Sequence, residues 1–380
     1  MVSGNVFRVG IIGCGFIGKV HAYAYRTLPF YYDPVPLRTR ITHVVTGGRA
    51  TADRAQRLLD ADVGGTDYRV ITENPEIDIV HVCTPNHAHA AAIGSAIQHG
   101  KHIYCDKPLV ADWEEACAID RMLDSYAQTG QMTFHNRFYP SIQHAKELVQ
   151  QGHLGQLLGF RATYLHGGSA NPEAPLKWKL TAAAGGGVIA DLASHVLDLV
   201  EYLAGPIDSV MAATHTAYAD RPSLDHPGTR VAVDAEDAVI SLVRLRSGAL
   251  GALEATKIAT GMEDELRLEL HGSRGALRFN LMDAHHLEIH RVAAGGQMPA
   301  WQRIQTGQRF PAPATSFPSP KASIGWLRGH VASLANFLAA VAAGESAVPD
   351  LRQGVRVQWL MECLRRSAAN RAWVDVDTAD

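Results

Sequence analysis

Two short stretches of the sequence hold residue types that can move protons or stabilise charge. "HIYCDKPL" (102–109) places Asp106 and Lys107 directly after an apolar run, and "GGGVIADLASHVLD" (185–198) contains Asp191 and His195. A lysine ammonium stabilises a developing alkoxide, and an imidazole accepts a proton near neutral pH. Each residue alone is typical of a solvated loop or helix surface. Their meaning therefore depends on the elements that position them.

The second stretch predicts an amphipathic helix with a polar stripe. Asp191, His195 and Asp198 recur at i, i+4 and i+7, which places them on one helical face. A separate apolar stripe contains Val188, Leu192, Val196 and Leu199. We therefore expect the polar stripe to face a cleft. Three interpretations stay open: a general base oriented by a carboxylate, a metal-ligand pair, and a helix-surface ion pair. The H-E-x-x-H pattern of zinc enzymes is absent, and no third ligand has convincing spacing, so no metal site is predicted.

A glycine-rich turn near the N-terminus predicts dinucleotide binding. "RVGIIGCGFIG" (8–18) is an apolar strand followed by Gly13, Gly15 and Gly18 in G-x-G-x-x-G spacing, and a helical pattern follows. In this arrangement the first glycine permits a tight turn, the second lets a pyrophosphate approach the backbone, and the third lets helix and strand pack closely. The phosphates then lie at the N–H groups that begin the helix.

Further apolar strands alternate with helical patterns up to about residue 134, which predicts a parallel sheet of the Rossmann type. Ligands of such sheets bind beyond the carboxyl ends of the strands. The loops at that edge supply the predicted cofactor contacts, which are Gly13, Gly15, Phe16, Ile17, Gly18, Thr46, Arg49, Cys83, Thr84, Pro85, Asn86, His87, Asp106 and Lys107.

The second strand ends in "VVTGGRA" and lacks the acidic residue that usually binds the ribose hydroxyls of NAD. Arg49 could instead bind the 2′-phosphate of NADP, or it could be a solvated loop residue. The expected cofactor is therefore NAD(P), with a slight preference for NADP.

Composition excludes several classes of protein. The 380 residues are 47% hydrophobic and 19% charged, with a formal net charge of −3, so neither nucleic acid nor a membrane surface is an expected partner. Five cysteines without C-x-x-C spacing indicate a reducing compartment. The N-terminal stretch has no signal-peptide pattern, and no apolar run is long enough to span a membrane. A cytoplasmic location is the expectation.

The length favours two domains. We expect the first at 1–134 and a second, α+β domain at 135–380, whose C-terminal helices pack back on the first or cover the junction. Strand patterns at 237–258, 266–280 and 286–292 predict a large, mostly antiparallel sheet with one open face. The proline-rich segment 299–320 predicts an irregular loop.

Four stretches together resemble the Gfo/Idh/MocA family of oxidoreductases (glucose–fructose oxidoreductase, inositol dehydrogenase and related proteins). They are "GIIGCGFIG", "VCTPNHAHAAAIGSAIQHGKHIYCDKPL", "HNRFYP" and "GGGVIADLASHVLDLVEYLAG". The family normally has Glu-Lys-Pro where this chain has Asp106-Lys107-Pro108, an acid one methylene shorter.

The resemblance implies roles for individual residues. Lys107 would hydrogen-bond the substrate hydroxyl, His195 would act as general base, and Asp191 would orient it or relay its proton. Trp178 and either Lys177 or Lys179 of "PLKWKL" (175–180) would contact a sugar ring and its hydroxyls, although Trp178 could equally pack the domain boundary. The open sheet face would form a homodimer or homotetramer.

The implied activity is hydride transfer between a nicotinamide and a secondary alcohol of a sugar, inositol or related polyol. Two alternatives stay open. One is a redox-assisted glycoside hydrolase with tightly bound NAD, and the other is a non-catalytic dinucleotide sensor.

Overall fold

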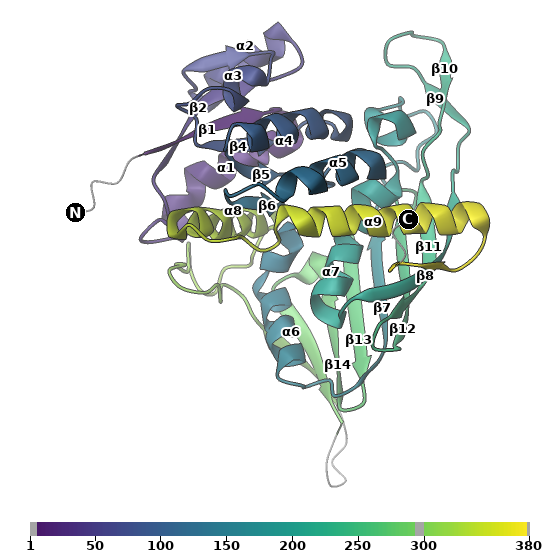
Figure 1. Cartoon of the computed structure of the whole chain (residues 1–380). Coiled ribbons are helices and arrows are strands. Elements are labelled where there is room, and N and C mark those ends of the chain that lie inside the picture. Colours follow the sequence, from purple (N-terminus) through teal and green to yellow (C-terminus); the bar gives the residue numbers. More distant parts are fainter. Residues whose placement is uncertain (1–5, 293–299, 378–380) are drawn as a thin grey trace. The chain divides into compact units, whose positions relative to one another are not determined.

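A computed structural model describes residues 6–292 and 300–377. The chain forms two compact units (Figure 1). The first comprises residues up to 135 together with 310–318 and 325–358, and the second comprises 136–309, 319–324 and the remainder from 359. The change of unit after His135 follows the short strand β6 (Gly130–Met132).

The first unit is built on a parallel sheet with strand order β3-β2-β1-β4-β5-β6. The other strands are β1 (Phe7–Ile12), β2 (Thr39–Val45), β3 (Val63–Gly65), β4 (Ile79–Val82) and β5 (His102–Cys105). Its helices are α1 (Phe16–Tyr31), α2 (Arg49–Leu59), α3 (Arg69–Thr72), α4 (His89–Gln98), α5 (Trp113–Leu123) and α8 (Trp326–Ala343). Strand order reverses between β1 and β4, the switch point where dinucleotides bind in sheets of this kind.

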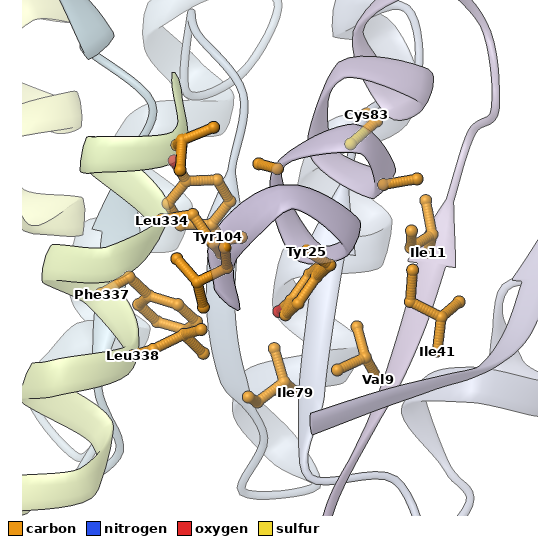
Figure 2. Close-up of a cluster of buried hydrophobic side chains, with 14 of the residues drawn as sticks. Val9, Ile11, Tyr25, Ile41, Ile79, Cys83, Tyr104, Leu334, Phe337 and Leu338 are labelled. Carbon is orange, nitrogen blue, oxygen red and sulfur yellow. The ribbon is translucent and has the colours of Figure 1, made fainter. Parts of the chain in front are cut away.

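Helix α8 completes the core of the first unit although it lies far along the chain. Figure 2 shows its Phe337 and Leu338 beside Tyr104 of β5, and the cluster continues through Ile79 to Val9. These side chains are almost fully buried. The apolar side chains of α8 are therefore part of the core of this unit. Each buried aromatic or leucine side chain stabilises the folded state by about 1.5–3 kcal/mol.

The second unit contains a nine-stranded mixed sheet, with strand order β16-β15-β14-β13-β7-β12-β11-β8-β17. Its strands are β7 (Leu157–Leu165), β8 (Ile207–His215), β11 (Ala238–Leu245), β12 (Leu250–Thr256), β13 (Glu265–Gly272), β14 (Gly275–Asn280), β15 (His286–Arg291), β16 (Trp301–Gln305) and β17 (Val374–Asp375). All neighbours are antiparallel except β12 and β7, which run parallel. Helices α6 (Pro140–Gln150) and α7 (Ser194–Ala204) cover one face (Figure 1). A separate ribbon is formed by β9 (Asp220–Pro222) and β10 (Arg230–Ala232), and α9 (Leu351–Asn370) begins in the first unit and continues into the second.

One face of this sheet is packed and the other is open. Along β11 the burial alternates, with Val239 and Val243 inside while Ile240 and Leu242 are 62% and 45% exposed. This alternation is typical of an antiparallel sheet with one covered face, as the sequence predicts.

Residues 182–204 are long and apolar enough to pass for a membrane span, but 83% of the most apolar window is buried inside the fold. This segment is therefore a core helix of the second unit.

The prediction of an irregular loop over 299–320 is wrong in part, because β16 adds an edge strand at Trp301–Gln305. The residues 293–299 before it lie outside the described part of the chain.

Candidate active site

The glycine turn of the first unit has the geometry that a pyrophosphate requires. Gly13 has a φ of +93°, and a Cβ there would lie 2.5 Å from the carbonyl oxygen of Cys83. A Cβ on Gly18 would lie 2.1 Å from the carbonyl oxygen of Gly13, whereas a Cβ on Gly15 would meet no atom within 4 Å. Two glycines are therefore needed by the fold, and the third leaves open space where α1 begins. The three positions fit a bound dinucleotide.

The loop after β2 contains the residues expected near the ribose. Thr46 Oγ1 lies 2.6 Å from Thr51 Oγ1. Arg49, at the first position of α2, is exposed and pairs through Nε with Asp53 Oδ1 at 2.9 Å. The Arg49 guanidinium is thus at the predicted edge of the sheet, in an exposed ion pair of the kind that contributes only about 0–1 kcal/mol.

His89 joins the two loops that follow β4 and β5. Its Nε2 lies 2.9 Å from the Thr84 carbonyl oxygen, and its Nδ1 lies 3.1 and 3.2 Å from those of Pro108 and Leu109. Burial lowers the pKa of this imidazole. The loop that carries Lys107 is therefore fixed to the loop that carries Thr84. His89 was missed in the sequence, where "NHAHA" offered a signal only in the repeated histidine.

The remaining predicted cofactor residues lie at this edge in different environments. Asp106, Lys107, Pro85 and Ile17 are half-buried, Asn86 is buried, and His87 and Phe16 are exposed. The Phe16 ring lies 5.7 Å from that of Trp326. The Thr84 hydroxyl is buried and has no hydrogen-bond partner within the described ranges. A buried hydroxyl without a partner lowers the stability of the fold unless a ligand or water forms a hydrogen bond with it. A bound dinucleotide at this edge could supply that hydrogen bond.

Cys83 has its backbone at the glycine turn, whereas its thiol points into the core (Figure 2). Its Sγ lies 3.1 Å from His21 Nδ1, which is also 3.1 Å from His81 Nδ1. Tyr25 Oη closes the group at 2.7 Å from His81 Nε2. Burial raises the pKa of the Cys83 thiol well above its usual value. The backbone of Cys83 is therefore the part of this residue that meets the glycine turn most closely, and its sulfur belongs to the buried group of His21, His81 and Tyr25.

In the second unit, Asp191 lies in a π-helical turn, η5 (Ile189–Ala193), that leads into α7. Such turns are rare and occur frequently at functional sites. Asp191 Oδ1 lies 2.9 Å from Lys179 Nζ, and Asp191 Oδ2 lies 3.3 Å from Lys257 Nζ. Both carboxylate oxygens therefore face ammonium groups, an arrangement that favours the ionised carboxylate. Lys257 was missed because it lies far from the predicted helix in sequence.

His195 is buried at the start of α7, and the Tyr164 ring meets its imidazole at a centroid distance of 5.8 Å. Tyr164 Oη donates to Asp264 Oδ1 at 2.7 Å, and His166 Nε2 lies 2.8 Å from the same oxygen. The predicted base thus contacts Tyr164 of β7, whose hydroxyl is held by Asp264 directly before β13.

Asp198 corrects the predicted polar stripe. It is buried and forms a two-point ion pair with Arg137, so it does not face a cleft. The apolar stripe is confirmed, since Val188, Leu192, Val196 and Leu199 are all buried.

Trp178 and Lys177 are exposed in the segment before the glycine run, and Lys179 Nζ lies 5.8 Å from the centre of the Trp178 ring.

Comparison with known families decides the identity of the chain. Residues 7–134 match the model of the oxidoreductase family with an NAD-binding Rossmann fold, and residues 142–278 match the GFO/IDH/MocA C-terminal domain. The chain belongs to the Gfo/Idh/MocA family of oxidoreductases. The resemblance noted in the sequence, and the two-part fold it implied, are confirmed.

Several Gfo/Idh/MocA relatives match along almost the whole chain. Levoglucosan dehydrogenase of Pseudarthrobacter phenanthrenivorans is 32% identical, over 97% of this chain and 98% of its own length. Inositol 2-dehydrogenase of Rhizobium meliloti is 25% identical, over 97% and 99%. A solved structure of levoglucosan dehydrogenase in complex with NADH and levoglucosan superposes with a TM-score of 0.93 at 32% identity, over 98% of this chain and 100% of that one. This chain is an NAD-binding oxidoreductase.

Proposed function

We propose that the protein is an NAD(P)-dependent dehydrogenase that oxidises a secondary alcohol of a sugar, inositol or related polyol. The observation that carries the proposal is Asp191, held between two lysines in a π turn that leads directly to His195. A non-catalytic dinucleotide sensor has no need of this arrangement. The glycine turn of the first unit supplies the fitting cofactor site.

Each proposed catalytic residue has a distinct task. Lys107 donates a hydrogen bond to the substrate hydroxyl and stabilises negative charge that develops on its oxygen. His195 accepts the hydroxyl proton as general base, and the Asp191 carboxylate stabilises the imidazolium that results. When bound, the nicotinamide accepts the hydride from the carbinol carbon.

For the substrate we propose a cyclic polyol or an anhydrosugar. An exposed Trp178 offers an apolar face of the kind that packs against a sugar ring, and Lys179 can donate to ring hydroxyls. The levoglucosan and inositol dehydrogenases among the relatives make levoglucosan and the inositols the first compounds to test.

For the cofactor we propose NAD(P), with a slight preference for NADP over NAD. Arg49 carries the preference, because an exposed guanidinium directly after β2 can exchange its Asp53 partner for a 2′-phosphate.

We further propose a cytoplasmic homodimer or homotetramer formed through the open sheet face. Leu242 of β11 pairs across strands with Met211 of β8, and Ile240 and Leu250 extend the same exposed apolar surface. Monomers rarely leave such a patch uncovered. Five cysteines without disulfides are in keeping with a reducing compartment.

The testing experiment is to follow the absorbance of reduced nicotinamide with purified protein, NAD or NADP, and a panel of levoglucosan, inositols and aldoses. Stoichiometric reduced cofactor with a subset of the panel is the expected result. A flat trace, together with tightly bound NAD and cleavage of a glycoside, would instead identify the redox-assisted hydrolase.

A further inference from the structure

Lys257 is a buried cation beside Asp191 to which the steps of the proposed reaction give no task of its own. It follows directly after β12, and its backbone N–H donates to the Asp237 carbonyl oxygen at 2.9 Å. Its side chain is only 6% exposed. Burying an ammonium group lowers the stability of the fold unless its N–H groups have hydrogen-bond or ion-pair partners. The acceptors around Lys257 therefore show which parts of the chain it holds in place.

The partners of the Lys257 ammonium include two backbone carbonyl oxygens and one carboxylate oxygen, all from the segment that leads to α7. They are the carbonyl oxygens of Lys179 at 3.2 Å and Gly187 at 3.3 Å, and Asp191 Oδ2 at 3.3 Å. The Gly187 carbonyl oxygen also accepts from the Asp191 backbone N–H at 3.1 Å. Lys257 is therefore bonded both to the Asp191 carboxylate and to the backbone that orients it.

The two lysines at Asp191 differ in kind. The Lys179 side chain is 50% exposed, so its pair with Oδ1 is screened by water and can be exchanged for a substrate hydroxyl. The Lys257 pair with Oδ2 is buried and tied to two carbonyls. One oxygen of Asp191 is thus held by the fold and the other meets an exposed partner.

We propose that Lys257 is a positioning residue for the reaction, which holds Asp191 ionised and fixes the π turn that precedes His195. This inference rests on the proposed function. Without the Lys257 charge, Asp191 takes up a proton at higher pH and can no longer stabilise the His195 imidazolium. The π turn also loses its link to β12.

The test compares Lys257→Met with Lys101→Met. Lys101 is an equally buried lysine whose ammonium donates to two backbone carbonyls, those of Asn74 at 2.6 Å and Ile77 at 2.7 Å, in the first unit. Both variants lose the packing and hydrogen bonds of a buried lysine, but only one removes a charge from Asp191. We expect Lys257→Met to lower kcat by about tenfold or more and to move the acid limb of the pH–rate profile to higher pH. Lys257→Arg should restore much of the profile, and Lys101→Met should leave it unchanged.

A second readout does not depend on turnover. In protein labelled with ¹³C at aspartate carboxyls and assigned with Asp191→Asn, the Asp191 titration midpoint should move to higher pH in Lys257→Met. The positioning role is overturned if this midpoint and the acid limb both stay where they are in the wild type, or if Lys101→Met shifts the profile equally. If the wild-type protein turns over no compound of the panel, but the Asp191 midpoint still lies at higher pH in Lys257→Met than in the wild type, the proposed function is overturned and the Lys257–Asp191 link stands.

Discussion

Arg137 and Asp198 form a two-point ion pair inside the second unit, with Arg137 Nε 2.7 Å from Asp198 Oδ2 and Nη2 2.5 Å from Oδ1. Both side chains are almost completely buried. The pair links the start of the second unit, one residue after Asn136, to the helix that carries His195. Removing one partner leaves an uncompensated buried charge.

Asp198→Ala is therefore expected to lower the free energy of unfolding by about 3–5 kcal/mol, measured by urea denaturation. The matched control is Asp220→Ala, which breaks the exposed pair with Arg230 and should lower the free energy of unfolding far less, because water screens that pair. Equal losses in the two variants would contradict a stabilising role specific to the buried pair.

The sequence could predict the first unit well because its signals are local. A G-x-G-x-x-G turn between a strand and a helix, and apolar strands alternating with helices, define a Rossmann sheet without reference to distant residues. The ends of strands are predicted less well: the strand and helix pattern continues to about residue 134, but β6 ends at Met132 and a 3₁₀ turn follows at His135–Phe138. Helix α8 could not be placed in this unit, since its apolar face says nothing of which core it joins.

The candidate site was predictable where residues are close in sequence and not where the fold brings them together. The i, i+4 spacing identified Asp191 and His195, but the same periodicity wrongly gave Asp198 a cleft-facing role, because its Arg137 partner is 61 positions away. Lys257 and His89 were missed for the same reason. A buried charged or polar side chain is explained by its partners, and those are set by tertiary structure.

The glycine turn gives a prediction that separates folding from cofactor binding. Gly15→Ala should fold normally, since its Cβ meets nothing within 4 Å, but it should weaken dinucleotide affinity because the methyl occupies the space for the pyrophosphate. Gly18→Ala should instead destabilise the protein, because its Cβ would clash with the Gly13 backbone. Thermal unfolding and dinucleotide titration measure the two effects. Unchanged affinity in Gly15→Ala would refute the predicted pyrophosphate position.

The buried histidines of the first unit predict acid sensitivity. Burial lowers the pKa of His21 to about 3 and that of His81 well below its usual value. Above the unfolded pKa of about 6.5, His21 is neutral in both states and adds no pH dependence. Below it the unfolded chain binds a proton that the folded protein does not, so stability falls as the pH falls towards 3. For His21 alone the loss between pH 7 and pH 5 is about 2 kcal/mol.

The variant His21→Gln removes this titrating group, so its free energy of unfolding should fall by about 2 kcal/mol less than that of the wild type between pH 7 and pH 5. His144→Gln, at a partly exposed histidine of α6, serves as the control and should keep the wild-type dependence. The same pH dependence in wild type and His21→Gln would show that His21 does not cause the acid sensitivity.

Arg49→Ala tests the cofactor preference. If the guanidinium binds the 2′-phosphate, this variant should raise the KM for NADP by about tenfold or more and leave that for NAD almost unchanged, because only NADP has the lost partner. The control Asp53→Ala releases Arg49 from its ion pair and should not raise the KM for NADP. An equal change for both dinucleotides in Arg49→Ala would exclude the contact.

His195 and Lys107 are expected to act mainly on turnover, although Lys107 also stands among the predicted cofactor contacts. His195→Ala should lower kcat by roughly 10²–10⁴-fold, the range for a lost general base. Lys107→Ala should abolish measurable turnover while its affinity for the dinucleotide, measured by fluorescence titration, stays close to that of the wild type. His166→Ala, which removes the imidazole that shares Asp264 with Tyr164, provides a comparison near His195 and should retain most of kcat. If kcat changes less than threefold in His195→Ala, His195 is not the general base. If Lys107→Ala loses dinucleotide binding, the main role of Lys107 is to bind the cofactor.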